Sequence, residues 1–142
     1  MYNANSISSY VINWCNSHNI DITNLKLQKL LYFLQGNFYR LTGLQLIDDD
    51  FYAWQLGPVI PHVYEKFAIY SAYSIPKQKR EPIDQNDECN CDLILKKYAK
   101  KSAWQLVEMS HHEDPWKYSY NIFGDKSKIP FSSIMEYYGR ST

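Results

Sequence analysis

Apolar residues recur every three or four positions along residues 23–41, and this spacing predicts an α-helix with one buried face. That face carries Leu27, Leu30, Leu31, Leu34, Phe38 and Leu41. Neighbouring aromatic residues widen the apolar band, so we expect the helix to be buried on more than one side. Thr23 or Asn24 can cap its N-terminus, and Gly43 follows its last apolar residue as a stop signal. The rest of the chain is therefore expected to pack around this helix.

The same helical period recurs in other segments. It predicts helices from about residue 6 to 18, from Pro61 to about 70, from about 87 to 101, after Ser102, after Asp114 and after Pro130. Ser102 and Gln105 have the spacing of a capping box, and Asp114 followed by Pro115 is typical of a helix N-terminus. Only residues 51–56 indicate an extended piece. We expect a mainly α fold: one compact helical domain over residues 1–142, built around a central buried helix, with at most a short β-element near residues 51–54.

Two polar segments are expected at the surface. Residues 74–90 are polar and contain Pro76 and Pro82, which predicts a long, variable and mobile loop. Asp48, Asp49 and Asp50 are consecutive, whereas calcium loops place carboxylates on alternate residues with a glycine between them. The aspartates are therefore interpreted as a solvated turn.

Composition narrows the function. The 142 residues include 15 basic and 15 acidic side chains. This balance argues against a protein whose main function is to bind nucleic acid or an anionic membrane. No apolar run is long enough to span a bilayer, and three cysteines without an export signal indicate reduced thiols in the cytoplasm. Aromatic residues make up 16% of the chain, with 13 Tyr and 4 Trp, and these side chains suit binding faces as well as cores.

Candidate chemistry is sparse. Cys89, Cys91, His111 and His112 are zinc-ligand types at poor spacing, and no phosphate loop or nucleophile elbow is present, so we expect no metal and no cofactor. Acidic neighbours should also raise the thiol pKa of both cysteines and blunt their reactivity. His111 with Glu113 has the composition of an acid–base pair, although such groups more often satisfy backbone at a helix junction.

A basic stripe offers a further alternative. Lys96, Lys97, Lys100 and Lys101 could hold phosphates, although lysines near a helix C-terminus also complement the helix dipole, and that interpretation is preferred. A small enzyme using His111 and Glu113, or a nucleic-acid-binding module using these lysines, thus remain alternative functions.

Three blocks together resemble a known family. They are L-K-L-Q-K-L-L-Y-F-L-Q-G at residues 25–36, F-Y-A-W-Q-L-G-P-V-I-P-H-V-Y at residues 51–64 and S-A-W-Q-L-V-E-M-S-H-H-E-D-P-W at residues 102–116. Blocks of this kind, in this order, are similar to those of the Panacea family, which comprises SocA-like antitoxins and phage-associated GepA-like proteins, often encoded beside toxin genes and on prophages.

The resemblance implies a helical domain that binds and neutralises a cognate toxin protein, and at least one member delivers its toxin to an energy-dependent protease. It implies no enzymatic activity, and no direct DNA binding without a separate domain. The positions that match the family motifs, or that we consider for partner binding, are Lys29, Trp54, Gly57, Pro58, Pro61, His111, Glu113, Pro115 and Trp116. Ser110 and His112 stand where the family more usually has threonine and an acidic residue, and Ala99-Lys100 replaces a frequent glycine, which leaves the partner's identity open.

Overall fold

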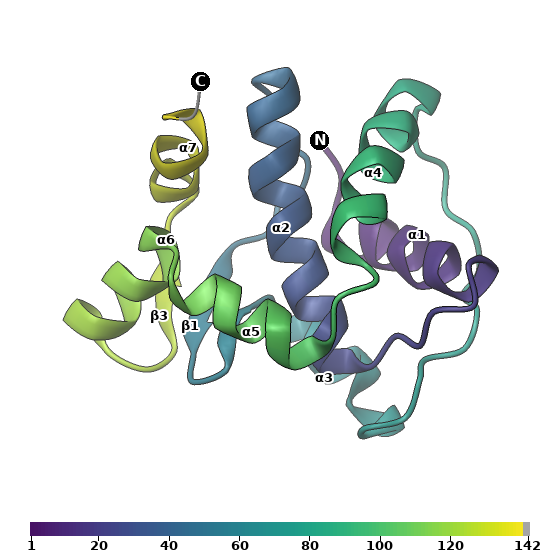
Figure 1. Ribbon diagram of the computed structural model, residues 1–142, viewed down its shortest axis with the longest axis horizontal. Coiled ribbons are helices and arrows are strands. Elements are labelled where there is room, and N and C mark those ends of the chain that lie inside the picture. Colours follow the sequence, from purple (N-terminus) through teal and green to yellow (C-terminus); the bar gives the residue numbers. More distant parts are fainter. Residues whose placement is uncertain (141–142) are drawn as a thin grey trace.

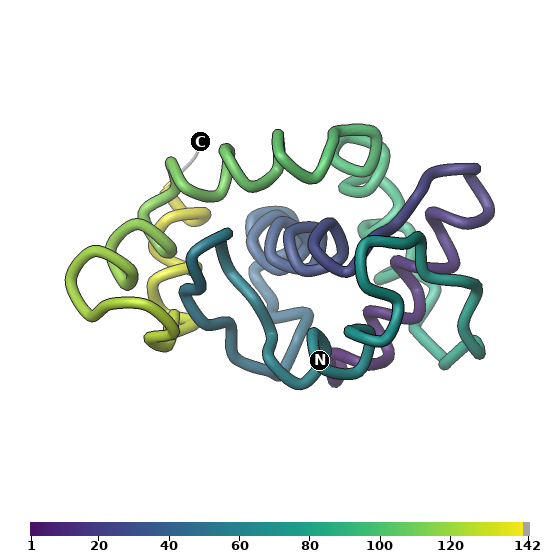
Figure 2. Tube along the Cα trace, turned by 90° about the horizontal axis from the view of Figure 1, so that it is seen from below, coloured from purple at the N-terminus to yellow at the C-terminus, as the bar shows by residue number. Residues whose placement is uncertain are grey.

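Helix α2 (Asn24–Thr42) runs through the middle of the molecule, and the other elements surround it (Figures 1 and 2). The computed structural model describes residues 1–140. Its other helical elements are α1 (Ala4–Ser17), α3 (Pro61–Phe67), η1 (Ala68–Tyr70), α4 (Gln85–Tyr98), α5 (Ala103–His111), α6 (Asp114–Tyr118), η2 (Ser119–Phe123) and α7 (Phe131–Gly139). In Figure 1, α1 and α4 lie on one side of α2, α6 and α7 on the other, and α5 crosses between them. The predicted mainly α fold is thus confirmed, and no helix within residues 1–140 is long and apolar enough to cross a bilayer.

The predicted central helix is confirmed almost to the residue. The Thr23 side chain accepts a hydrogen bond from the Lys26 backbone amide, and Gly43 ends the helix with a left-handed φ of 74°. The expected apolar face is buried except at Leu41, which is 55% exposed. Leu41 still lies on the same side of the helix as Leu30 and Leu34, but it is the last residue but one of α2, and the side chains that cover the earlier turns no longer cover it there.

The β-element is larger than the sequence indicates. Strand β1 (Phe51–Trp54) pairs antiparallel with β2 (Gly57–Val59) and with β3 (Ser127–Ile129), which gives the order β2-β1-β3. Strand β1 was expected, whereas β3 was not, because a three-residue strand carries no periodicity and depends on a partner far away in the sequence. The sheet joins the C-terminal part of the chain to the centre.

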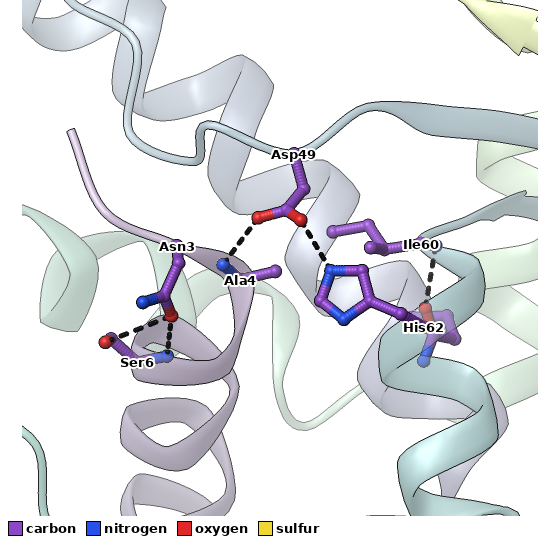
Figure 3. Close-up of polar contacts among 7 residues, drawn as sticks. Asn3, Ala4, Ser6, Asp49, Ile60 and His62 are labelled. Carbon is purple, nitrogen blue, oxygen red and sulfur yellow. Dashed lines mark hydrogen bonds and ion pairs between the residues drawn. The ribbon is translucent and has the colours of Figure 1, made fainter.

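The first helix begins earlier than predicted. It starts at Ala4 rather than near residue 6, and Asn3 caps it by accepting a hydrogen bond from the Ser6 amide. Asp49 supports the same helix end, since one carboxylate oxygen accepts from the Ala4 amide at 2.7 Å and the other contacts His62 of α3 at 2.5 Å (Figure 3). The interpretation of the aspartates as a merely solvated turn is therefore wrong for Asp49, which joins α1 to α3.

The polar connection before α4 is shorter and better anchored than predicted. Helix α4 begins at Gln85, so residues 85–90 are helical and the connection spans residues 71–84. Within it Ile75 is fully buried, and its backbone amide donates to the Ile22 carbonyl at 2.8 Å. Asn13 of α1 also exchanges two hydrogen bonds with the backbone of Gln78. These contacts attach the segment to α1 and to the turn before α2.

Helix α2 also carries buried polar side chains that bind the backbone of the following segment. Asn24 donates to the Tyr64 carbonyl, and Gln28 accepts from the Ile60 amide. Gln35 both donates to the Ile47 carbonyl and accepts from its amide. Because buried backbone groups are costly when unpaired, these side chains determine how residues 47–64 lie on α2.

Candidate functional site

The three sequence blocks meet at the turn between β1 and β2. Helix α2 brings Lys29 to it from one side, and the α5–α6 junction brings His111 and Trp116 from another. Trp54 ends β1, and Gly57 begins β2. We call this set of residues, together with the Gln55 and Pro58 carbonyls, the hairpin cluster.

Lys29 is the most unusual member of the hairpin cluster. Its side chain is fully buried, and its Nζ donates to the Pro58 carbonyl oxygen at 2.9 Å. No carboxylate within residues 1–140 forms an ion pair with it. Burial disfavours the charged ammonium and lowers the pKa of Lys29 to about 7. The lysine matched to the family motif therefore fastens the hairpin to α2, and its amine has no access to solvent.

Gly57 makes this close packing possible. Its φ is +111°, and a Cβ at this position would lie 2.7 Å from Lys29 Cε and 2.7 Å from the Ser110 hydroxyl. The next residue, Pro58, is also buried and supplies the carbonyl that Lys29 binds. Ser110 is fully buried and donates to the Val107 carbonyl.

We expect Gly57→Ala to lower the free energy of unfolding by about 2 kcal/mol or more, because it combines a disfavoured backbone conformation with overpacking. Gly124→Ala is the matched control, since Gly124 has a φ of +96° and no atom within 4 Å of the point that a methyl group would occupy. Urea denaturation of both variants would separate the free-energy cost of the positive φ, which both share, from the cost of the steric contact, which only Gly57→Ala makes. Equal losses in the two variants would contradict the tight approach of Lys29 and Ser110.

His111 and Trp116 clamp the hairpin turn. His111 Nε2 lies 3.1 Å from the Gln55 carbonyl oxygen, which can only accept, so this nitrogen carries the proton. Trp116 Nε1 donates to the Trp54 carbonyl at 2.8 Å, and the rings of His111 and Trp116 stack with centroids 4.0 Å apart. Burial lowers the pKa of His111, and the bond to Gln55 acts in the opposite direction. Pro115, also buried, occupies the first turn of α6 and sets the direction in which Trp116 enters the core.

Glu113 belongs to a different set of contacts. Its Oε1 accepts hydrogen bonds from the hydroxyls of Tyr32 at 2.8 Å and Tyr138 at 2.5 Å. Burial raises the pKa of Glu113, while the two tyrosine bonds oppose that shift. Glu113 also precedes α6 as its N-cap residue, the position that the sequence assigned to Asp114, and makes no side-chain cap bond.

The acid–base pair considered as an alternative for His111 and Glu113 is not assembled among the described residues. His111 binds the hairpin, whereas Glu113 binds α2 and α7, and no hydrogen bond or ion pair joins the two side chains. The geometry matches the preferred interpretation, in which both groups satisfy polar atoms at a helix junction.

The solvent side of the hairpin cluster is a groove of about 520 Å³. Trp54 is half-buried there. Its ring packs edge-on against the ring of Tyr64, with the two centroids 5.2 Å apart, and the Lys126 ammonium lies 5.4 Å from the Trp54 ring centroid. Pro61, the last of the predicted motif positions, starts α3 and thereby directs Tyr64 towards this groove. Lys126 was not anticipated, because nothing local in the sequence links it to Trp54, and Tyr64 was not singled out although it ends the same block.

The cysteines and histidines considered as zinc ligands lie apart. Within residues 1–140 no group of three or more His, Cys, Asp or Glu side chains is arranged to hold a metal ion. Cys91 is buried, and burial followed by the charges of Asp87 and Glu88 raises its thiol pKa to about 12. A thiol of this kind is a poor nucleophile at neutral pH, as the sequence predicted.

Comparison with known proteins identifies the family to which the three sequence blocks belong. Residues 27–117 match the family model described as "Antitoxin SocA-like, Panacea domain". A curated protein, Antitoxin SocA of Caulobacter vibrioides (strain NA1000 / CB15N), is 32% identical over 127 residues, which cover 80% of this chain and 68% of that protein. The chain belongs to the SocA-like Panacea family. No solved structure matches it.

The region that matches the Panacea family model begins within α2 and ends within α6. It therefore contains Lys29, the β1–β2 hairpin, His111 and Trp116. Helices α1 and α7 lie outside it. In this chain the matched motif residues thus hold the Panacea core together, and most of them are buried.

Proposed function

We propose that this chain is the antitoxin of a toxin–antitoxin pair and neutralises a cognate toxin by direct protein–protein binding in the cytoplasm. The observation that carries the proposal is the likeness to Antitoxin SocA, which extends over 80% of the chain. Membership of the Panacea family points in the same direction. Delivery of the bound toxin to an energy-dependent protease is the mode of neutralisation that we propose to test first.

The site geometry supports a binding role over a catalytic one. Lys29 is enclosed, and His111 and Glu113 use their polar atoms to hold backbone or tyrosine hydroxyls. A stable protein interface typically covers roughly 800 Å² on each partner and depends on a few aromatic or arginine anchors. The chain has exposed aromatic side chains suited to that purpose, among them Trp104 and Tyr118, which are 62% and 65% exposed.

Co-expression with the product of the neighbouring reading frame tests the proposal. We expect that product alone to stop growth, the pair to grow, and the two proteins to purify together. His111→Ala and Glu113→Gln distinguish binding from catalysis, because the amide of Gln can still accept from Tyr32 and Tyr138. Both variants should retain the complex and the rescue if they fold.

Two results would count against the proposal. If a folded Glu113→Gln or His111→Ala variant kept the complex but lost rescue, chemistry by these side chains would be required. If the wild-type chain neither bound the product nor restored growth, the neighbouring product would not be its toxin, and antitoxin activity by that association would be rejected.

A further inference from the structure

The last turn of α4, the turn that follows it and the start of α5 carry four lysines and an exposed tryptophan within residues 96–104. Lys96, Lys97 and Lys100 are exposed, Lys101 is partly exposed, and Trp104 is 62% exposed. We call these five residues the lysine–tryptophan surface. Asp92 and the exposed Glu108, one turn after Trp104 on α5, flank this stretch, and no acidic residue occurs between them, although the chain as a whole has a formal net charge of zero. The charge on this surface is therefore local.

Most of this charge is not neutralised by the protein itself. Lys96 pairs with Asp92 at 3.0 Å. Lys97, Lys100 and Lys101 form no ion pair within residues 1–140. Lysines that complement the helix dipole lie in the last turn of a helix, and each stabilises an exposed helix by at most about 1 kcal/mol. This effect does not account for Lys100 and Lys101, which follow the end of α4.

The backbone that carries Trp104 is fixed, although the side chain is exposed. It lies in the first turn of α5, where Ser102 and Gln105 form the predicted capping box, with the Ser102 hydroxyl accepting from the Gln105 amide and the Gln105 side chain accepting from the Ser102 amide. Because the backbone of this turn is already ordered, a partner that covers the ring has to immobilise the side chain alone. Tryptophan is also among the residue types most enriched at energetically important interface positions.

We propose that the lysine–tryptophan surface binds an acidic protein segment that carries an apolar side chain. Carboxylates of the segment pair with Lys97, Lys100 and Lys101, while its apolar side chain packs on Trp104. Within the proposed antitoxin function, on which this assignment of the partner rests, the segment belongs to the cognate toxin.

The charge pattern of α4 favours an acidic segment over a nucleic acid. Asp87 and Glu88 lie in the first turn of α4 and Asp92 in its middle, so the basic part covers only its C-terminal end. Only Lys96 and Lys97 lie within α4, and Lys100 and Lys101 follow in the turn after it, so the basic part is short, whereas sequence-independent nucleic-acid binding typically uses a longer basic groove. A polyanion that continued along α4 would meet carboxylates.

Fluorescence anisotropy with a labelled short peptide rich in Asp and Glu around a central Phe-Leu pair tests the surface without the toxin. We expect binding that weakens several-fold between about 50 and 300 mM NaCl, because exposed charges are screened. Lys97→Glu/Lys100→Glu should weaken it about tenfold or more, and Trp104→Ala several-fold. Lys77→Glu/Lys79→Glu, on the connection before α4, makes the same change in net charge elsewhere and should leave binding unchanged.

The outcomes separate this inference from the proposed function. It is overturned if the wild-type chain does not bind the acidic peptide, if the control pair weakens binding equally, or if a single-stranded oligonucleotide of equal charge binds more tightly. Binding to the neighbouring reading frame's product, unaffected by Lys97→Glu/Lys100→Glu, would overturn it while the antitoxin function stood. Peptide binding without rescue of growth would support the surface and reject that toxin as its partner.

Discussion

Leu31→Ala is expected to lower the free energy of unfolding by about 2–5 kcal/mol, through the lost transfer energy and the cavity that remains. Leu31 is fully buried in the middle of α2, and the neighbouring core residues Leu30, Tyr32 and Leu34 leave little room for collapse. Urea denaturation followed by circular dichroism measures the change in the midpoint and slope.

Leu41→Ala supplies the control on the same helix. Leu41 is 55% exposed, so the same truncation there should change stability by only about 0.5 kcal/mol. Similar losses at both positions would contradict the difference in burial between the middle of α2 and its last turn.

Stability is also expected to rise between pH 7 and 8.5, by about 1.5 kcal/mol from Lys29 alone. The pKa of the buried Lys29 is lowered to about 7, against an ordinary value of 10.5. In this window the unfolded chain holds the lysine proton and the folded chain does not, so unfolding takes up a proton. Raising the pH therefore opposes unfolding, and below pH 7 the slope from this group disappears. The raised thiol pKa values of Cys15 and Cys91, about 11 and about 12, act in the opposite direction only near and above their ordinary value of 9.0.

Lys29→Met should remove most of this slope, because the apolar side chain does not titrate. Lys79→Met removes an exposed lysine instead and should keep the wild-type pH dependence. Chemical denaturation at a series of pH values gives both slopes. A wild-type slope that persists in Lys29→Met would assign the proton uptake to another group, such as Lys26, whose pKa burial also lowers.

The local part of the site could be anticipated, but not its assembly. The motif resemblance singled out Lys29, Gly57, His111 and Trp116, and all four lie in the hairpin cluster. Which atoms they contact depends on where the β1–β2 turn meets α2 and the α5–α6 junction. Buried polar residues at helical spacing on α2, Asn24 and Gln28 among them, were the one available signal for these backbone contacts.

What the sequence alone determined is local. The 3.6-residue period predicted the helices, and short-range chemistry marked several of their ends: Thr23 and Gly43 on α2, and the Ser102 capping box on α5. These signals act within a few residues, so they can be recognised without the rest of the chain.

The tertiary structure alone decided the non-local features. Strand β3 exists because β1 offers it a partner, Asp49 accepts a hydrogen bond from the first amide of α1 although it lies 45 residues away, and Glu113 binds two tyrosine hydroxyls instead of His111. The lysine–tryptophan surface likewise requires α4 and α5 to leave their lysines and Trp104 uncovered. Each of these features depends on which surfaces the packing buries and on which backbone groups still need a hydrogen-bond partner. The spacing of neighbouring residues encodes neither the buried surfaces nor the unpaired backbone groups.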